Sequence, residues 1–246
     1  MVAAGQACPL CGSPGAPTGE TVDGCPLRAC CGVLLAWPHA SVADYEGKYA
    51  SQDAAYHDGE MRATGRQAFV GRDTEYLQTA IARLRLLREL YPRAQTLLDV
   101  GCGTGSLVAN AGAFGFQAYG LEPCPVLVRW GQSMGRRVNE GGWEAVRGQW
   151  DLILLLDVLE HLTEPLAALE RLREATKTGG AVVVEMPEYV APGGEWQRHV
   201  KPREHPCLYS ADAALALFAR AGFRWDAITR PLGGTLAKIV FYLRRA

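Results

Sequence analysis

The sequence predicts an α/β protein: a mostly parallel sheet of seven strands with helices on both faces, preceded by a small Cys-rich segment. Short apolar runs alternate with helix-length segments from residue 96 onward, which is typical of parallel strands joined by crossover helices. Five of the eight cysteines lie within the first 31 residues, so the start of the chain differs in character from the rest. Such clustering indicates a metal site rather than a disulfide framework, because no secretory signal is visible.

Composition and charge argue against several classes of protein. Hydrophobic residues make up 48% of the 246 residues and charged residues 21%, as in a folded globular chain. The net charge of -1 is a poor match to a general nucleic-acid binder or a protein of anionic membranes. No apolar run approaches the roughly 18–20 residues of a membrane span, and residues 1–6 lack the basic start of a secretory signal. We therefore expect a cytoplasmic protein without membrane contact.

Helices are predicted where apolar residues recur at helical spacing. The first runs from Arg66 to Tyr91 and ends before Pro92. Further helices are expected at 106–114, 126–134, 164–175 and 210–221. Thr163 is the expected N-cap of the helix at 164–175, and Gly222 is the expected stop of the last helix.

Strands are predicted from short apolar runs between these helices. They are expected at 96–100, 117–122, 136–139, 151–156, 181–186, 223–229 and 236–243, the last two as a hairpin. A long irregular loop runs from Pro187 to Tyr209. Because this loop follows the carboxyl end of a strand, it is expected to carry substrate determinants.

A glycine-rich turn follows the first strand of the predicted α/β domain. The run Leu98-Asp-Val-Gly-Cys-Gly-Thr-Gly105 leads from a buried strand into a helix, and glycine lets the backbone pass close to a ligand. A nicotinamide-type dinucleotide site needs G-x-G-x-x-G, whereas these glycines follow G-x-G-x-G. The spacing favours a different adenosine-type ligand. At the end of the next strand, the carboxylate of Glu122 can accept both hydrogen bonds of a ribose diol.

The glycine run and Glu122 together resemble class I S-adenosylmethionine-dependent methyltransferases, whose sheet is Rossmann-like. The segment 150–162, with Asp157-Val-Leu-Glu-His161, and the turn and strand at 178–185 share this resemblance, which covers about residues 66–246. The resemblance implies that S-adenosylmethionine is the cofactor and S-adenosylhomocysteine the product. The implied cofactor residues are Asp99, Gly101, Cys102, Gly103 and Gly105 around the methionine part, Glu122 at the ribose, Pro123, Gly142 and Trp143 near the adenine, and Asp157 behind the cofactor.

The run from Asp157 to His161 leaves three roles open. Asp157 stands three and four residues before Glu160 and His161, so their side chains can share one helical face at the pocket mouth. His161 can act as a general base for an acceptor hydroxyl. Alternatively, Asp157, Glu160 and His161 bind a divalent metal together with His205, since similar runs occur in metal-dependent 2'-O-methyltransferases of small RNAs and in ubiquinone-biosynthesis O-methyltransferases. The third interpretation is structural, with His161 capping the helix.

Substrate contacts are expected from two polar segments that carry aromatic side chains. The candidate residues are Tyr45, Tyr49, Glu188, Trp196, His199 and His205. Tyrosine and tryptophan can stack on a ring. The basic stretch 198–203 can meet a carboxylate or phosphate, or it can be a solvated loop face.

The N-terminal cysteines have one intact zinc-binding spacing. Cys8-Pro-Leu-Cys11-Gly12 places two thiolates for one tetrahedral ion. In the second half, Arg28 stands where the partner of Cys31 is expected, so Cys25 is predicted as the fourth ligand, with Cys30 as the alternative. The predicted set is Cys8, Cys11, Cys25 and Cys31 around a structural zinc. Residues 8–56 resemble the zinc-ribbon start of some bacterial methyltransferases of sugar and natural-product pathways.

These features predict a zinc-ribbon-like module at 1–40, a Tyr-containing linker or lid at 41–65 and a methyltransferase domain at 66–246. The expected function is methylation of a small-molecule acceptor, on oxygen, in the biosynthesis of a secondary metabolite, saccharide or similar compound. The first alternative is an RNA methyltransferase whose ribbon binds nucleic acid. The second is a non-catalytic adenosylmethionine-binding or assembly protein. A homo-oligomer is compatible with the sequence.

Overall fold

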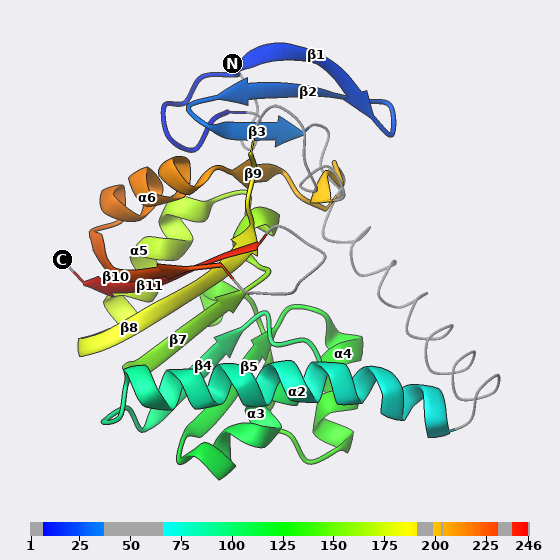
Figure 1. Cartoon of the computed structure of the whole chain (residues 1–246), viewed down its shortest axis with the longest axis vertical. Helices are drawn as coiled ribbons and strands as arrows, with labels where there is room; N and C mark the ends of the chain where they lie inside the picture. The colour runs from blue at the N-terminus through cyan, green and yellow to red at the C-terminus, as the bar shows by residue number, and fades with distance from the viewer. Residues whose placement is uncertain (1–6, 37–65, 191–198, 203, 231–237, 246) are drawn as a thin grey trace. The chain divides into compact units, whose positions relative to one another are not determined.

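The computed structural model describes residues 7–36, 66–190, 199–202, 204–230 and 238–245, with the side chains of 66–77 left out (Figure 1). The described residues form two sheets. One has four strands in the order β1-β2-β3-β9, and the other has seven in the order β10-β11-β8-β7-β4-β5-β6. The chain divides into two compact units, Met1–Ala40 with Ile153–Ala246 and Ser41–Leu152. The predicted α/β fold with a seven-stranded, mostly parallel sheet is confirmed.

The unit Ser41–Leu152 contains the first strands and helices of the seven-stranded sheet. Its elements are α2 (Arg66–Leu90), β4 (Thr96–Val100), α3 (Ser106–Asn110), the 3₁₀ turn η1 (Ala111–Phe114), β5 (Gln117–Glu122), α4 (Pro125–Ser133), β6 (Val138–Glu140) and the 3₁₀ turn η2 (Trp143–Ala145). Strand β4 pairs in parallel with β5, and β5 pairs in parallel with β6. The carboxyl ends of the three strands therefore meet at one edge.

The other unit holds the remaining elements. These are β1 (Ala16–Val22), β2 (Cys25–Cys30), β3 (Val33–Ala36), β7 (Trp150–Leu156, which begins in the unit just described), the 3₁₀ turn η3 (Leu159–His161), α5 (Pro165–Ala175), β8 (Thr176–Pro187), β9 (Cys207–Tyr209), α6 (Ala211–Arg220), β10 (Phe223–Thr229) and β11 (Lys238–Arg245). Helix α5 packs against β8, and α6 packs against β10. Strand β11 runs antiparallel to both β8 and β10, so the predicted closing hairpin is confirmed.

Three local features differ from the sequence prediction. The helix expected at 106–114 narrows after Asn110 into a 3₁₀ turn that ends at Gly115, whose φ is 76°. The prediction of Thr163 as an N-cap is wrong: Glu164 occupies the cap position and Pro165 begins the helix, so no side chain caps it. The loop at 187–209 contains β9, which was not predicted. Gly222 does end α6, with φ 80° and an amide that donates to the Ala219 carbonyl at 3.0 Å.

Two tight turns join the first three strands. We call these strands and the turn before them (residues 7–36) the ribbon. In Asp23-Gly24 and in Cys31-Gly32, both central residues have positive φ, as in type I′ hairpins. Strand β3 pairs antiparallel with β9, which comes from near the other end of the chain. The ribbon thus shares a sheet with residues 207–209, and the predicted boundary at residue 40 stays a prediction.

No helix in the described ranges is long and apolar enough to cross a membrane. The core is instead built from short strands such as β7, whose residues 152–155 are almost wholly inaccessible to solvent. An uninterrupted apolar strand of this kind has both faces covered.

Replacing Leu154 by alanine tests this core. Leu154 is 1% exposed, so Leu154→Ala is expected to lower the free energy of unfolding by roughly 2–5 kcal/mol. Leu86 on α2 is 39% exposed, and Leu86→Ala is expected to change it by less than about 0.5 kcal/mol. Urea unfolding of both variants measures the difference, and equal losses would contradict the assignment of β7 as the buried centre.

Candidate functional site

The glycine run after β4 forms a turn that only glycine tolerates. Gly101, Gly103 and Gly105 have φ values of 76°, 57° and 77°, in the left-handed region. A side chain on Gly105 would lie 2.4 Å from Val138 Cγ2, so close packing also requires glycine there. At Gly103, by contrast, no atom lies within 4 Å of where a side chain would begin. The turn therefore leaves open space beside the Gly103 backbone that a ligand can fill.

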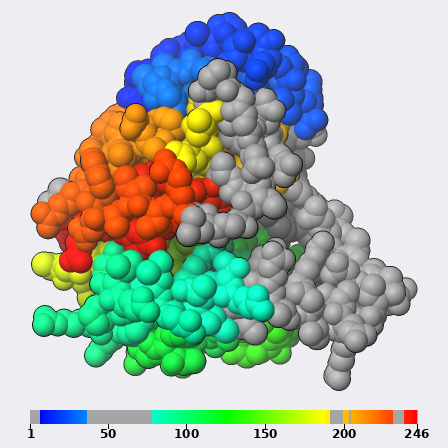
Figure 2. All heavy atoms as spheres, in the orientation of Figure 1, coloured from blue at the N-terminus to red at the C-terminus, as the bar shows by residue number. Residues whose placement is uncertain are grey.

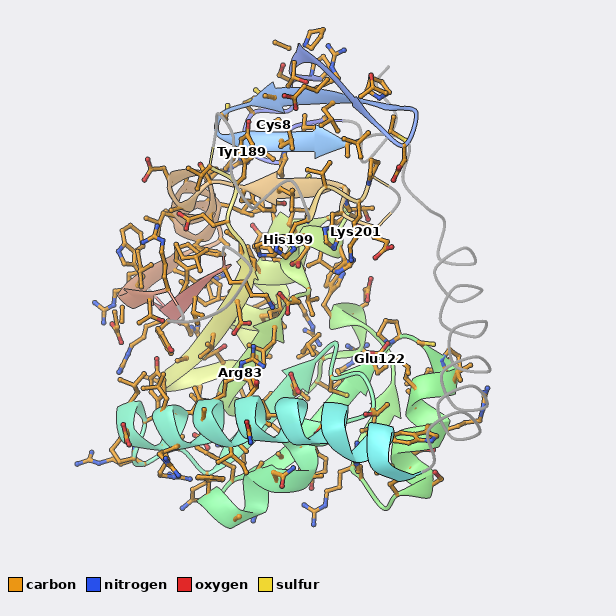
Figure 3. All side chains as sticks on the ribbon, turned by 45° about the vertical axis from the view of Figure 1, so that its right-hand side comes forward. Cys8, Arg83, Glu122, Tyr189, His199 and Lys201 are labelled. Carbon is orange, nitrogen blue, oxygen red and sulfur yellow. The ribbon has the colours of Figure 1, made fainter. Side chains whose placement is uncertain are left out.

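Glu122, at the end of β5, holds this turn by its side chain (Figure 3). One carboxylate oxygen accepts the Gly103 amide at 2.9 Å, and the other accepts the Cys124 amide at 2.9 Å. Burial raises the pKa of Glu122, and the two amides partly offset that rise. Each carboxylate oxygen keeps a further lone pair, so Glu122 can still accept hydrogen bonds from a ligand diol.

Asp99, on β4, is near Glu122 on the neighbouring strand β5 and is 4% exposed. Burial raises its pKa to about 7, with the Glu122 charge adding to the rise and the Arg83 guanidinium on α2 opposing it. Arg83 was not predicted from the sequence, although its spacing, three residues after Ala80 and four before Leu87, places it on the apolar face of the predicted helix and was a usable signal. Cys102 fills the space beside Gly120, where a side chain would lie 2.4 Å from the sulfur.

The predicted adenine-side residues follow β5 and β6. The Gly141 amide donates to the Glu122 carbonyl at 3.0 Å, which holds the turn after β6 to the end of β5. Gly142 and Trp143, half-buried, come next at the start of η2. Pro123 is exposed directly after Glu122. These residues therefore border the same strand ends as the glycine turn.

In the other unit, Asp157 follows β7 in a strained conformation. Its φ is 57°, and its amide donates to the Glu185 carbonyl at 2.9 Å. The ammonium of Lys238 at the start of β11 donates to the Asp157 carboxylate and, at 3.3 Å, to Glu185 Oε1. Lys238 was missed by sequence analysis, although a single lysine at the start of an apolar strand is unusual. This one ammonium therefore bridges two carboxylates.

Glu160 is the most deeply buried acid at this edge, with 1% of its surface exposed. Its Oε2 atom has no hydrogen-bond partner among the described residues. Burial, with the Asp157 charge in second place, raises the pKa of Glu160 to about 8. The side chain is therefore mostly a neutral acid at pH 7.

His161 and His205 lie edge to face, with ring centroids 4.5 Å apart. Nδ1 of His161 bonds the Glu204 carbonyl at 2.9 Å, and Nδ1 of His205 bonds the His199 carbonyl at 2.5 Å. Because a carbonyl only accepts, each neutral ring carries its proton on Nδ1 and leaves Nε2 as an acceptor. Burial lowers the pKa of both rings, that of His205 to about 4. One ligand atom each from Glu160, His161 and His205 lies within 4.8 Å of the others.

Of the other predicted substrate residues, the structure describes only Glu188 and His199. Glu188 makes a two-pronged ion pair with Arg230, at 2.7 and 2.6 Å, so its charge is already neutralised. His199 is buried, and its Nε2 has no partner within the described part of the chain (Figure 3). Tyr45, Tyr49 and Trp196 lie outside the described residues.

The ribbon brings four cysteine sulfurs together, and one of them differs from the prediction. Cys8, Cys11, Cys30 and Cys31 each offer a sulfur within 4.8 Å of the others. The prediction of Cys25 is corrected, because Cys25 begins β2 and Cys30 ends it. Five residues of strand separate them by roughly 16 Å, and the Cys25 thiol donates instead to the Asp23 carbonyl. Adjacent Cys30 and Cys31 can converge because Cys31 enters the tight turn with φ 55°.

A cavity between the first residues of the ribbon and the start of α5 holds none of these residues. It is lined by Ala7, Pro9, Leu162, Thr163, Glu164, Pro165, Leu166, Ala167, Glu170, Pro206 and Cys207. Its walls are mainly apolar and include neither His161 nor His205.

Residues 71–228, more than half of the chain, match the family described as "Methyltransferase domain". The chain belongs to this family. A relative named "Ubiquinone biosynthesis O-methyltransferase" from Shewanella halifaxensis is 31% identical over 96 residues, which are 35% of this chain and 41% of the relative. One of the same name from Methylobacterium nodulans is 27% identical over 180 residues, which are 61% of this chain and 70% of the relative. The chain thus spans about two fifths of the first of these relatives.

Solved structures show the same fold. The 1,6-didemethyltoxoflavin-N1-methyltransferase of Burkholderia thailandensis, with S-adenosylhomocysteine bound, has a TM-score of 0.61 at 18% identity. The match covers 94% of this chain and 99% of that one. The predicted methyltransferase fold and family are therefore confirmed.

Replacing Glu122 tests the cofactor edge. Glu122→Ala is expected to weaken S-adenosylhomocysteine binding roughly 10- to 100-fold, the loss of a hydrogen-bonded charged acceptor. Glu140 is the matched control, because it is exposed and pairs with Glu122 across β5 and β6. Calorimetry measures both affinities, with circular dichroism to confirm folding. Unchanged affinity in folded Glu122→Ala would contradict the site.

Proposed function

We propose that this protein is an S-adenosylmethionine-dependent methyltransferase that methylates an oxygen of a small-molecule acceptor in a biosynthetic pathway. The observation that carries this proposal is the open glycine turn whose Gly103 amide is held by the Glu122 carboxylate. Membership of the methyltransferase family supports the reaction class. The names of the ubiquinone-biosynthesis relatives support oxygen as the methylated atom.

The residues at the cofactor edge fit S-adenosylmethionine. Gly101, Cys102, Gly103 and Gly105 supply a backbone wall without protruding side chains, and the open space at Gly103 suits the methionine part. Glu122, at the end of β5, accepts the ribose hydroxyls, and the buried Asp99 on β4 is proposed to face the methionine part. Pro123, Gly142 and Trp143 border the adenine, and Asp157, held by Lys238, is proposed as a further cofactor residue. When bound, the cofactor supplies an electrophilic methyl group on a sulfonium.

On the acceptor side, we assign the proton transfer to His161. Its Nε2 is an acceptor because Nδ1 is fixed on the Glu204 carbonyl. Burial lowers the pKa of His161, so the ring is neutral and ready to take the acceptor hydroxyl proton at pH 7. The His205 ring packs against the His161 ring. The neutral Glu160 side chain can donate a hydrogen bond to the acceptor. Most of the rate enhancement comes from aligning the two reactants, since methyl transfer is an in-line displacement.

A metal-assisted variant of the same reaction is favoured by one observation. Glu160, His161 and His205 offer a carboxylate and two imidazoles within 4.8 Å, and both rings are oriented by backbone carbonyls, as metal-ligating histidines are. A divalent ion there would polarise the acceptor oxygen. Asp157 is not part of this set, because Lys238 occupies its carboxylate.

The acceptor is proposed to be a small molecule. The net charge of -1 disfavours RNA, and the edge of β3 that a ribbon could offer to a partner is already paired with β9. Glu188, His199, Trp196 and the tyrosines Tyr45 and Tyr49 are the proposed acceptor contacts. With Glu188 neutralised by Arg230, a ring with hydroxyl groups suits this set better than a strongly charged ligand.

We also propose that Cys8, Cys11, Cys30 and Cys31 hold a structural zinc. Four thiolates on a tetrahedral zinc lie about 3.8 Å apart. The Cys11 and Cys30 sulfurs are 3.3 Å apart, and those of Cys30 and Cys31 are 3.4 Å apart, so only a small expansion is needed. Amide and thiol donors lower the pKa of Cys11 to about 7, which favours the thiolate that zinc requires.

The activity is tested with methyl-labelled S-adenosylmethionine and a cell metabolite extract. Label is expected in the small-molecule fraction and not in RNA. His161→Asn is expected to slow the transfer roughly 100- to 10,000-fold with unchanged S-adenosylhomocysteine affinity. Label transferred only to RNA, or no transfer with any extract, would overturn the proposal.

Chelation separates the two forms of catalysis. If His161 acts as a base, rigorous treatment with EDTA leaves the transfer rate unchanged. A loss that added Mg²⁺ restores would assign Glu160, His161 and His205 to a metal instead. Both assays use protein whose ribbon zinc content has been checked after treatment, so that loss of the ribbon metal is not mistaken for loss of a catalytic one.

Zinc content tests the corrected cysteine set. Purified protein is expected to hold about one zinc per chain, and Cys30→Ser is expected to lose most of it. Cys25→Ser makes the same change on the same strand and is expected to retain the metal. Elemental analysis measures both, and zinc retained by Cys30→Ser but lost by Cys25→Ser would restore the original assignment.

A further inference from the structure

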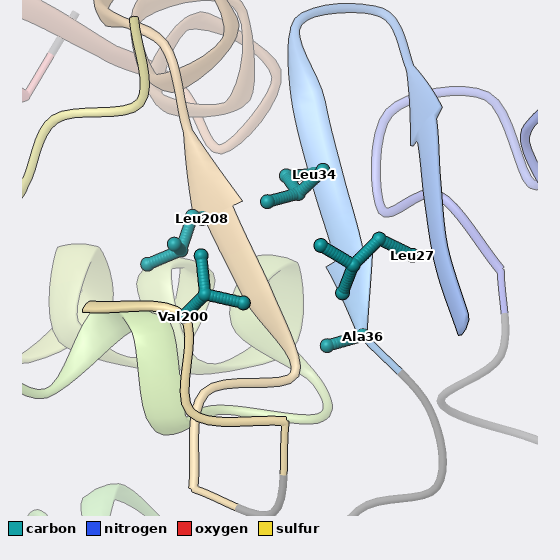
Figure 4. Close-up of a cluster of buried hydrophobic side chains, with 5 residues drawn as sticks. All are labelled: Leu27, Leu34, Ala36, Val200 and Leu208. Atoms are coloured by element: carbon teal, nitrogen blue, oxygen red, sulfur yellow. The ribbon is translucent and has the colours of Figure 1, made fainter. Parts of the chain in front are cut away.

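The ribbon packs against the segment that carries His205. Leu27, Leu34 and Ala36 of the ribbon form one buried cluster with Val200 and Leu208 (Figure 4). All five side chains are less than 9% exposed. Val200 lies five residues before His205 and Leu208 three residues after it. The ribbon therefore buries both flanks of the histidine-bearing loop.

Backbone hydrogen bonds fix the same segment. Strand β9 pairs with β3 from Val33↔Tyr209 to Leu35↔Cys207, and the Ala36 amide donates to the Pro206 carbonyl at 3.1 Å. On its other side, Tyr209 accepts the Tyr189 amide at 2.9 Å. Strand β9 is only three residues long, and a strand this short is not stable without its neighbours. Its position therefore depends on β3.

The histidine contacts depend in turn on this segment. His205 bonds the His199 carbonyl, and its ring meets that of His161 at 4.5 Å. His161 bonds the Glu204 carbonyl. The orientation of both rings is thus set by the backbone carbonyls of His199, next to the ribbon contact at Val200, and of Glu204, four residues before the contact at Leu208.

The two cysteine turns attach directly to the element that follows β9. In the turn of Cys31 and Gly32, the Gly32 carbonyl accepts the Ser210 amide at 2.8 Å, and a side chain on Gly32 would lie 2.5 Å from Ser210 Oγ. In the first turn, the Pro9 and Leu10 carbonyls accept the guanidinium of Arg220 on α6. The space-filling view shows the ribbon in blue in contact with the orange residues near 210–220 (Figure 2).

We propose that the metal-bearing cysteine turns of the ribbon position the acceptor-side histidine pair by way of β9, so that zinc sets the geometry of His205 and His161. The ribbon is too small to hold its shape by its core alone, and a metal staple is the usual remedy in such modules. Without the zinc, β3 is no longer held in place. Strand β9 and the histidine-bearing segment before it then lose the strand against which they pack. The glycine turn and Glu122 belong to the other unit, Ser41–Leu152, and serve as the reference. The catalytic meaning of the histidine geometry rests on the proposed function.

The test compares the two edges of the full-length protein after zinc removal. Hydrogen exchange is measured by mass spectrometry for peptides covering 199–210 and, as the internal reference, 96–105 and 117–124. Chelated wild type and Cys30→Ser are expected to exchange at 199–210 at least roughly tenfold faster, with the reference peptides within about twofold. Added zinc restores protection in wild type, and Cys25→Ser behaves as wild type throughout.

NMR of the ring nitrogens reports the tautomer of His205, which a general loosening of the ribbon alone would not change. In the zinc-loaded protein, the His205 ring, assigned with His205→Gln, is expected as the Nδ1-protonated form, and zinc removal mixes the two neutral forms. Zinc loss that leaves exchange at 199–210 and the His205 tautomer unchanged would overturn the proposal. S-adenosylhomocysteine affinity is measured in the same samples. Absent binding there contradicts the proposed function, whereas intact binding with altered His205 supports the positioning role alone.

Discussion

The Glu122 carboxylate joins two turns at the carboxyl ends of neighbouring strands. It accepts the Gly103 amide from the turn after β4 and the Cys124 amide from the turn after β5. The strand register places both turns at the same edge, the amides of Gly101 and Cys102 donate to the Leu121 carbonyl, and the carboxylate adds the link to Gly103. A ligand that needs a bare backbone wall and an acceptor for a diol finds both in one rigid unit. The cofactor assignment, and with it the choice of reaction, depends on this interaction.

The proposed acceptor side differs from the cofactor edge in the charge state of its polar groups. Its polar groups are largely uncharged or paired: Glu160 is a buried neutral acid, the histidines are neutral, and Lys238 and Arg230 form ion pairs with neighbouring carboxylates. Such a site can exchange a proton with an acceptor without attracting a highly charged one. Its histidines are oriented by backbone carbonyls at 199 and 204, and the nearby residues 207–209 pair with a ribbon strand distant in sequence.

The fold was predictable because it depends on local patterns, and the structure brings the predicted glycine turn and Glu122 together. Strand and helix periodicity, the glycine spacing and an acid at a strand end are all readable within a few residues. The acceptor side was only partly predictable, since Lys238 reaches Asp157 across 81 positions of sequence and β9 pairs with β3 across more than 170. The choice of Cys25 over Cys30 failed for a related reason. The positive φ of Cys31 lets adjacent cysteines converge, and spacing rules alone do not include that backbone turn.

The most direct test of the account observes the two amides that Glu122 holds. In a titration with S-adenosylhomocysteine followed by amide NMR, the Gly103 and Cys124 signals are predicted to shift together and to saturate at one ligand per chain. Their shifts should exceed those of the β10–β11 hairpin, which lies at the other end of the sheet order. Saturable binding that leaves the Gly103 and Cys124 signals unmoved would contradict the placement of the cofactor at this edge.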